Sequence, residues 1–336
     1  GMFQIIELSY GDGSVHITDL NGTGQLQVIG AINIGTGLGG NDATVTWTNG
    51  GTISADEINV GYSVGDVVTG TLRSDSTAPI QANTVYFGRG GGATGILDLG
   101  ASDSFILGTS TDRTGSLRLA FDNTNAFTST ATTTADLDLS LTNPDFQAFL
   151  ATDLSIGYHG NGNNGSIVNG SLVLGSNSLV DLGTAAVPAD LNVGVNVDID
   201  TASGLGEANG GFDARQGTVD ANLSTLNVGA SSAGGSANGT MSMDVNNSVS
   251  ATTVNIGTGA NATGTLNLQG GQLVAETVNA AGPDSTFNFT GGRLGIGGET
   301  LATGTFNGTL DQQGGTLAPG FSRTITSTTG IAELNG

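Results

Sequence analysis

The stretch VNIGTGANATGTLNLQGGQL at residues 254–273 contains no charged residue, and its apolar residues alternate with Asn, Thr and Gln. In a β-strand alternate residues point to the same face, so Leu266 and Leu268 are predicted to point inward and Asn267 outward. Glycine stands at nearly every break in this alternation. Because glycine supplies the positive φ that a sharp corner requires, the stretch predicts short strands joined by tight bends.

Three variants of this phrase recur along the chain. Apolar–x–apolar–Gly occurs as INIG (32–35), INVG (58–61), VYFG (85–88), FILG (105–108), LSIG (154–157), LNVG (191–194), LNVG (226–229) and VNIG (254–257). A phrase of the type Gly-x-Leu follows as GTL (70–72), GILDL (95–99), GSLRL (115–119), GSLVL (170–174), GTMSM (239–243) and GTLNL (264–268). Gly-Gly-x-Leu/Ile occurs at 50–53, 270–273, 291–294 and 314–317. Each repeat unit is therefore predicted to hold about three strands.

A three-strand unit cannot bury its own apolar face, so its repetition predicts a β-solenoid. We predict an all-β, single-stranded, right-handed parallel β-helix of about 10–13 rungs, forming one domain over residues 1–336. The handedness follows from the crossover preference of parallel strands. Residues 312–336 are interpreted as a C-terminal capping region or a link to a downstream segment, because terminal rungs need protection from edge pairing.

One segment departs from the repeat. Between residues 121 and 153 glycine is absent and Thr is frequent, which indicates a Thr-rich insertion. Within it Asn143 could act as an N-cap, with Pro144 at the first helical position and Asp145 in the first turn. The segment therefore predicts one short helix over 143–152, packed on the side of the solenoid.

The composition excludes several function classes. The 29 acidic residues outnumber seven arginines, lysine is absent, and the net charge is −22. This charge opposes binding to nucleic-acid phosphates and to anionic membrane surfaces. The absence of Cys excludes disulfides and thiolate metal sites. No apolar run reaches the 18 residues that a membrane-spanning helix needs.

The last third of the chain resembles a known family. GTLNLQGGQL, STFNFTGG and QQGGTLAPG (312–320) are similar to the autotransporter-associated β-strand repeat, most closely over residues 225–320. Such repeats occur in large bacterial surface and exported proteins. The resemblance implies an extracellular or bacterial cell-surface location, with an export signal upstream. The motifs of this repeat are structural, so the resemblance implies no catalytic residue.

Two glycine-rich stretches look like ligand-binding motifs. GTGLGG (35–40) satisfies G-x-G-x-x-G, but a dinucleotide site would need a helix next, whereas NDATVTWT predicts a strand. Such matches arise by chance in a chain with 58 glycines among 336 residues. GGNDATV (39–45) resembles one copy of a calcium-binding nonapeptide, which requires several consecutive copies. A calcium site built on scattered Asp side chains remains an alternative.

Pairs of carboxylates share faces of predicted strands. Asp136 and Asp138 are two residues apart, as are Asp198 and Asp200. Alternating Asp with apolar neighbours is typical of any solvated strand face, which is the interpretation we favour. β-Helical lyases and hydrolases nevertheless use outward carboxylates for calcium or for acid–base chemistry.

If the chain is an enzyme, the residues expected to act are Asp198, Asp200, Asp213 and Arg215. They lie between Gly194 and Gly229, a long gap in the repeat where a groove wall could form. Arg215 would be the basic group of a lyase.

The remaining singular residues favour structural roles. His16 alternates with apolar neighbours and is predicted to face out of a strand, whereas His159 lies in the loop YHGNGNNG. No nucleophile motif accompanies either histidine. Trp47, the only tryptophan, is predicted to be a core or end-cap residue.

Asparagine occupies the middle of the first phrase in five of its eight copies, at Asn33, Asn59, Asn192, Asn227 and Asn255. If the strands stack in register, these amides are expected to form a hydrogen-bonded ladder. A flat amide array could instead dock a glycan.

The sequence thus favours a non-catalytic stalk or adhesin-like structural module that contacts surface glycans or other matrix proteins. The alternatives are a β-helical polysaccharide lyase or hydrolase, or a glycan-binding module. Aromatic residues are only 5% of the chain, few for an enzyme that holds sugars on aromatic platforms. No cofactor and no catalytic, cofactor-binding or metal-binding residue is assigned.

Overall fold

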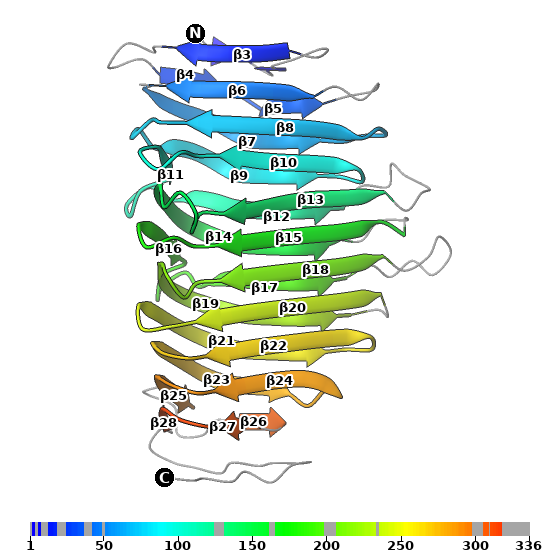
Figure 1. Ribbon diagram of the computed structural model, residues 1–336, viewed down its shortest axis with the longest axis vertical. Helices are drawn as coiled ribbons and strands as arrows, with labels where there is room; N and C mark the ends of the chain where they lie inside the picture. Colours follow the sequence, from blue (N-terminus) through cyan, green and yellow to red (C-terminus); the bar gives the residue numbers. More distant parts are fainter. Residues whose placement is uncertain are drawn as a thin grey trace.

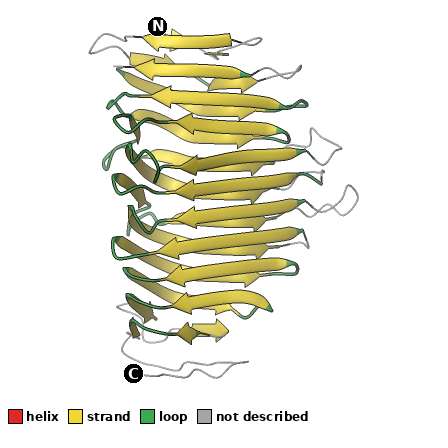
Figure 2. Cartoon of the chain, viewed as in Figure 1, coloured by secondary structure: helices red, strands yellow, loops and turns green. Residues whose placement is uncertain are grey.

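The computed structural model describes residues 2–3, 6–7, 13–18, 25–36, 42–48, 51–123, 131–160, 165–197, 206–232, 235–297, 305–308 and 310–317. Every helix or strand element in these ranges is a strand, and the strands pair in parallel in two sheets. Figure 1 shows them stacked from the N-terminal to the C-terminal end, and no element is coloured as helix in Figure 2. The predicted all-β parallel solenoid is confirmed.

Sheet B contains 11 strands, one for each rung of the described chain, which agrees with the predicted 10–13 rungs. Its strands are β3 (Gly13–Thr18), β6 (Ala43–Thr48), β8 (Val68–Ser74), β10 (Ala93–Asp98), β13 (Thr132–Asp138), β15 (Ile167–Val173), β18 (Glu207–Asp213), β20 (Ser236–Met243), β22 (Ala262–Leu268), β24 (Asp284–Phe289) and β27 (Asp311–Gln312). They are paired in this order.

Sheet A contains 17 strands and supplies the other two sides of each rung. Its strands are β1 (Met2–Phe3), β2 (Ile6–Glu7), β4 (Gln25–Val28), β5 (Ala31–Thr36), β7 (Thr52–Tyr62), β9 (Ile80–Arg89), β11 (Ser104–Leu107), β12 (Thr114–Asp122), β14 (Asp145–His159), β16 (Ser178–Leu182), β17 (Ala189–Asn196), β19 (Thr218–Ser231), β21 (Asn247–Thr258), β23 (Gln272–Ala280), β25 (Arg293–Ile296), β26 (Thr305–Gly308) and β28 (Thr316–Leu317). The long strands run along both sides: the first part of β7 pairs with β4 and the second part with β5. Three strand segments per rung match the predicted repeat unit.

The core is a column of inward side chains from all three sides. Leu266 and Leu268 of β22 are fully buried, as their alternation predicted. Trp47, predicted to be a core or end-cap residue, is buried in the core. Phenylalanines stack between rungs, with the ring centroids of Phe105 and Phe146 6.0 Å apart. Each rung therefore buries its apolar face against its neighbours.

Two columns of glycine face each other inside the stack. Gly194 ends its β17 phrase with φ 64°, and Gly210 lies opposite it on β18. A methyl group on Gly210 would overlap the backbone nitrogen of Gly194 and the carbonyl oxygen of Ile156. The same approach pairs Gly61 with Gly70, Gly88 with Gly95, Gly157 with Gly170, Gly229 with Gly239, and Gly257 with Gly264. Sheets A and B therefore meet at a distance that only glycine permits.

The helix predicted over 143–152 is wrong, because residues 145–159 form strand β14. Phe146, Ala148 and Leu150 are fully buried at a spacing of two residues, which a strand can bury on one face and a helix cannot. Asn143 does not cap a helix. It has φ 52° and accepts a hydrogen bond from the Asn177 backbone nitrogen at 2.9 Å, so it forms a turn held by the next rung.

The glycine-free segment 121–153 contributes regular rungs where it is described. Its strand β13 pairs with β15 over seven residues. The chain phrase LRLA (117–120) occupies the column of the first phrase, with Ala120 at φ 50° in the place of glycine. Ala135 likewise is in register with Gly170 of the facing column. LRLA is therefore a copy of the first phrase that lacks the closing glycine.

Two phrases occupy a different column of the stack from the one that their sequence pattern predicts. FILG (105–108) forms β11 and pairs with the first part of β14, while GSLRL (115–119) lies in β12 of sheet A. Most of the region 312–336, interpreted as a cap or link, lies outside the described residues. Its described part, 312–317, includes β28, which pairs with β25.

Candidate functional site

Asparagine side chains form a hydrogen-bonded ladder on the outer face of sheet A. Each Nδ2 donates to the Oδ1 of the asparagine in the preceding rung at 2.8–2.9 Å. The bonded pairs are Asn59 to Asn33, Asn227 to Asn192, Asn255 to Asn227, Asn279 to Asn255 and Asn307 to Asn279. The predicted ladder is confirmed for all five asparagines of the first phrase, and it extends two rungs further.

Replacing Asn227 with alanine is expected to lower the free energy of unfolding by about 1–2 kcal/mol. The change leaves the Asn192 oxygen and the Asn255 amide without their partners in the ladder. The matched control is Asn222→Ala on the same strand, because no hydrogen bond involves the Asn222 side chain among the described contacts. Urea unfolding of both variants measures the difference. Equal losses would contradict the stabilising role of the ladder.

The ladder is interrupted in the middle rungs by rings and guanidinium groups. Between Asn59 and Asn192, its column holds Tyr86, Arg118 and Ser155. A second column, three residues further along each strand, holds Tyr62, Arg89, Phe121 and Tyr158. The arginine–aromatic cluster is defined here as Tyr62, Tyr86, Arg89, Arg118, Phe121 and Tyr158.

Cations cover the ring faces in this cluster. The guanidinium carbon of Arg89 lies 4.4 Å from the ring centroid of Tyr86 and 4.9 Å from that of Tyr62. Arg118 lies 4.6 Å from the centroid of Phe121, whose ring stacks on Tyr158 at 5.1 Å. Cation–π and stacking contacts therefore join four successive rungs. Arginine covers one face of Tyr86 and of Phe121, and these two rings are only 4% and 5% exposed, so they are not an open platform for a sugar.

Carboxylates neutralise both arginines of the cluster. Glu57 pairs with Arg89 at 2.6 Å. Asp153, which is 7% exposed, accepts hydrogen bonds from Nη2 and Nε of Arg118 at 2.9 and 3.0 Å. It also accepts from the Ser116 and Ser155 hydroxyls at 2.5 and 2.9 Å. Burial opposes the charge of Arg118, but the contacts with Asp153 outweigh it and raise the pKa of Arg118.

Tyr158 is one of three tyrosines in the cluster, and its side chain is partly buried. Burial raises the pKa of its hydroxyl, and the charge of Arg118 opposes this effect. A hydroxyl with a raised pKa stays protonated at neutral pH and is a poor base. The cluster therefore holds rungs together, and each of its arginines is neutralised by a carboxylate.

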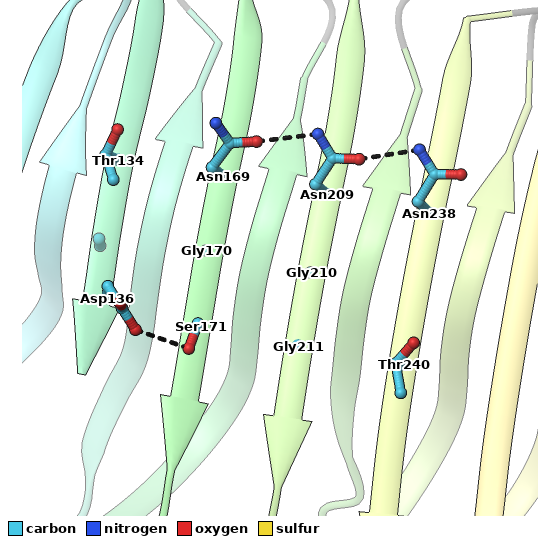
Figure 3. Close-up of a pocket in the computed structure, with 11 residues that line it drawn as sticks. Thr134, Asp136, Asn169, Gly170, Ser171, Asn209, Gly210, Gly211, Asn238 and Thr240 are labelled. Carbon is cyan, nitrogen blue, oxygen red and sulfur yellow. Dashed lines mark hydrogen bonds between the residues drawn. The ribbon is translucent and has the colours of Figure 1, made fainter. Parts of the chain in front are cut away.

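The outer face of sheet B carries a shorter ladder beside a groove (Figure 3). Asn238 donates to Asn209, and Asn209 to Asn169, each at 2.8 Å. The groove has a volume of about 350 Å³, and its lining includes these amides, Gly210 and Gly211. A Cβ on Gly211 would have no atom within 4 Å, so the groove exists because this position lacks a side chain.

The structure brings together only part of the predicted enzyme site. Asp213 and Arg215 form an ion pair at 2.6 Å across a turn, and Asp213 also accepts from the Arg215 backbone nitrogen at 3.1 Å. Asp198 and Asp200 lie outside the described residues. Hydrogen bonding to Arg215 lowers the pKa of Asp213, and a carboxylate with a lowered pKa is a weak general base at neutral pH.

Replacing Arg215 with glutamine is expected to raise the pKa of Asp213 towards its ordinary value, because the guanidinium bonds that favour the carboxylate are lost. In the unmodified protein this pair stabilises the fold above the ordinary aspartate pKa, and the contribution is lost as the pH falls through the lowered value. Carbon-detected NMR titration of the Asp213 carboxyl measures the shift. An unchanged titration would contradict the pairing in solution.

The other acidic pair faces solvent as predicted. Asp136 and Asp138 are both exposed on β13. Asp136 accepts a hydrogen bond from the Ser171 hydroxyl at 2.7 Å, and Asp138 accepts one from the Ser140 hydroxyl at 2.6 Å. No histidine contacts either serine in the described structure, so neither pair is an activated nucleophile.

His159 is fully buried and belongs to a polar network at a corner of the stack. Its Nε2 lies 2.9 Å from the Ser166 hydroxyl, which donates to Asp122 at 2.6 Å. The serine is thus between the histidine and the carboxylate, whereas a nucleophilic triad places the histidine in the middle. The network is inaccessible and fixes the corner. His16 lies on β3, and its side chain is outside what the structure describes.

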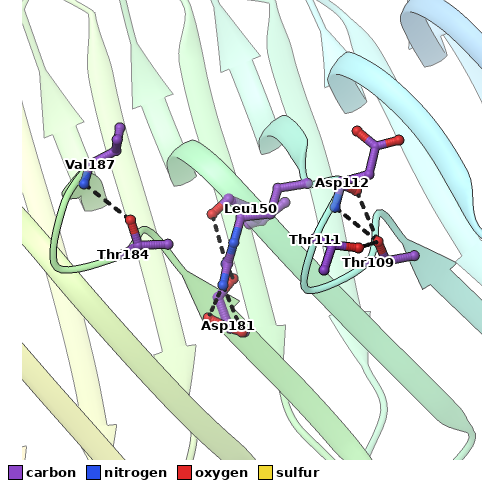
Figure 4. Close-up of polar contacts among 8 residues, drawn as sticks. Thr109, Thr111, Asp112, Leu150, Asp181, Thr184 and Val187 are labelled. Atoms are coloured by element: carbon purple, nitrogen blue, oxygen red, sulfur yellow. Dashed lines mark hydrogen bonds and ion pairs between the residues drawn. The ribbon is translucent and has the colours of Figure 1, made fainter.

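Arg113 lies between β11 and β12 and joins three rungs through Leu150 and Asp181, which Figure 4 labels. Its Nη2 binds both carboxylate oxygens of Asp181 at 2.9 Å, and its Nη1 donates to the backbone oxygens of Asp181 and Leu150 at 3.0 and 3.3 Å. Neighbouring turns are closed by hydroxyls, as where Thr184 accepts from the Val187 nitrogen at 3.1 Å. This bidentate pair is a structural clamp.

The glycine-rich motifs acquire no ligand-binding geometry in the described chain. GTGLGG is followed by strand β6, as predicted, and its residues 37–40 lie outside the described ranges. Of GGNDATV, residue Asp42 accepts a hydrogen bond from the Thr69 nitrogen at 2.9 Å. Within the described ranges no group of three His, Cys, Asp or Glu side chains could hold a metal ion, and no helix could span a membrane.

Comparison of the chain with protein-family models, curated proteins and solved structures finds no match. The resemblance to the autotransporter-associated repeat therefore stays a prediction.

A sequence pattern that could have predicted the arginine–aromatic cluster is the residue after the glycine of the first phrase. Tyr62, Arg89 and Tyr158 each directly follow the glycine of a first phrase, in INVGY, VYFGR and LSIGY. The groove had a comparable signal in Gly210-Gly211, because the other copies of its phrase place a side chain after the glycine.

Proposed function

We propose that the chain is a non-catalytic, rigid structural module of an extracellular or bacterial cell-surface protein, with an adhesin-like role in contacting surface glycans or other matrix proteins. The observation that carries this proposal is the direction of the polar bonding. The asparagine ladders run along the stack and join one rung to the next. Such bonding favours a long, stable spacer, which is what a stalk requires.

The state of the charged groups supports the same proposal. Of the six arginines among the described residues, five pair with a carboxylate at 2.6–2.9 Å. A lyase or hydrolase needs a carboxylate or a base whose pKa lies near the working pH and which can reach the substrate. The clearest described candidate, Asp213, is held ionised by Arg215.

The composition supports the proposed location. A chain without Cys and Lys, with net charge −22 and a surface rich in Asn, Thr and Gly, suits an exported protein that needs no disulfides. A continuous hydrogen-bonded stack supplies the stability that disulfides provide in small secreted domains.

Labelling of intact cells of the source organism tests the location and role. Antibodies against the purified chain are expected to bind unpermeabilised cells or the surrounding matrix. Binding only after permeabilisation would contradict the proposal. The enzyme alternative has its own test: a panel of acidic polysaccharides is incubated with the protein, with and without Ca²⁺. We expect no new reducing ends and no unsaturated products, and either product would favour a hydrolase or a lyase instead.

A further inference from the structure

The groove on the outer face of sheet B is a built feature of four successive strands. Its floor is formed by Gly210 and Gly211 of β18 (Figure 3). The amides of Asn169, Asn209 and Asn238 line one side. On the other side, the same outward column holds Asp136, Ser171 and Thr240, with Gly211 between Ser171 and Thr240.

The fold does not require glycine at position 211. Its φ is not positive, and a Cβ there would meet nothing within 4 Å, unlike the neighbouring Gly210. The following strands carry Thr240, Thr265 and Thr286 in the same column. Glycine weakens a strand interior and marks places where another molecule approaches the backbone closely. The absence of a side chain at Gly211 leaves the strand backbone open to a ligand in the groove.

The lining determines the chemistry of that occupant. Asn209 donates one N–H to Asn169 and the other to the Glu207 carboxylate at 3.0 Å. Asn238 donates only to Asn209 and keeps a second N–H for an external acceptor, and the Asn169 amide nitrogen donates to no described group. The Thr240 hydroxyl adds a donor and acceptor, and the exposed Asp136 carboxylate accepts from hydroxyl groups. No arginine lines the groove, and the net charge of −22 repels anions.

We propose that the groove at Gly211 binds one sugar residue of a neutral glycan. The flat face of the ring lies on the glycine backbone, and its hydroxyls bond to Thr240 and to the amides of Asn238 and Asn169. The groove volume of about 350 Å³ falls in the range of small-ligand sites. Because the amide ladder runs along the stack, the glycan chain lies along the rod. This inference rests on the proposed adhesin-like function and names its ligand class.

Titration with cellohexaose, xylohexaose, maltohexaose and chitohexaose tests the proposal, with hexagalacturonate as the anionic comparison. Binding is followed by NMR shifts of the Gly211 amide and the Asn238 side-chain NH₂. At least one neutral hexaose is expected to shift both signals, and hexagalacturonate is expected to bind more weakly. Absence of binding by every neutral hexaose, or tighter binding of the anionic one, would overturn the proposal.

Filling the groove provides the matched variants. Gly211→Thr and the smaller Gly211→Ser are expected to fold normally, because the position has room, and to lower the affinity by about tenfold or more. The control Thr265→Val lies two strands further along the same column, outside the groove lining, and should keep full affinity. Unchanged affinity in folded Gly211→Thr would overturn the groove assignment, whereas the labelling of intact cells decides the adhesin-like function separately.

Discussion

Gly210→Ala is expected to destabilise the protein by about 3–5 kcal/mol, whereas Gly211→Ala, one residue later, should leave it unchanged or stabilise it by up to about 1 kcal/mol. A methyl group on Gly210 meets the backbone of Gly194 and Ile156, which cannot move without separating the sheets. A methyl group on Gly211 meets nothing and removes the conformational freedom of glycine from the unfolded chain.

Chemical unfolding of the two variants, followed by circular dichroism, measures this contrast. Both substitutions add the same atoms to the same strand, so each variant controls for the other. Similar stability of the two proteins would show that sheets A and B do not approach as closely as the facing glycine columns require.

Asp153→Ala is expected to lower the free energy of unfolding by about 3 kcal/mol, because removing one partner of a largely buried pair leaves the other charge uncompensated. The carboxylate accepts four hydrogen bonds, two of them from Arg118, whose side chain is only 25% exposed. The loss should be concentrated in the middle rungs, where the arginine–aromatic cluster replaces the asparagine ladder.

A second substitution separates charge from packing. Arg118→Met in the Asp153→Ala background is expected to recover part of the lost stability, because it removes the unpaired cation and keeps an unbranched side chain beside the Phe121 ring. The measurement is the urea midpoint of the single and double variants. A double variant that is less stable than Asp153→Ala would show that the stacking of Arg118, and not the ion pair, dominates.

The periodic part of the sequence was sufficient to predict the fold. Alternation in GTLNL predicted which leucines are inward, and the five asparagines of the first phrase predicted the ladder because parallel strands in register place identical positions above one another. The glycines were understood only in part. The positive φ of the phrase-ending glycines is a local property that the sequence pattern indicates. The contact between Gly194 and Gly210 joins two phrases whose spacing along the chain varies, so the pattern does not predict it.

The errors arose where local signals competed with stacking. Asn143, Pro144 and Asp145 are good helix-start residues, yet the buried alternation of β14 prevailed because the rungs on both sides offer partners. FILG was read as a copy of the first phrase because it ends in glycine, while the true copy, LRLA, ends in Ala120. Tertiary register decides such cases, and one sequence alone does not contain it.

The candidate sites were less predictable than the fold. The pairing of Asp213 with Arg215 follows from a spacing of two residues across a turn, which is local. The Arg118–Asp153 network joins residues 35 apart in sequence, and the groove depends on four strands. These features can be identified only once the strand register shows which residues of neighbouring rungs lie side by side.

The distance between two spin labels on one outward column tests most directly whether the described chain is a single in-register rod. Thr71 and Thr286 lie in the same column of sheet B, seven strand spacings apart. The protein has no Cys, so cysteines introduced at these positions are the only labelling sites. Pulsed electron–electron resonance is expected to give a narrow distribution near 34 Å, from a spacing of about 4.8 Å per strand. A broad distribution, or one centred far from this distance, would contradict the continuous stack.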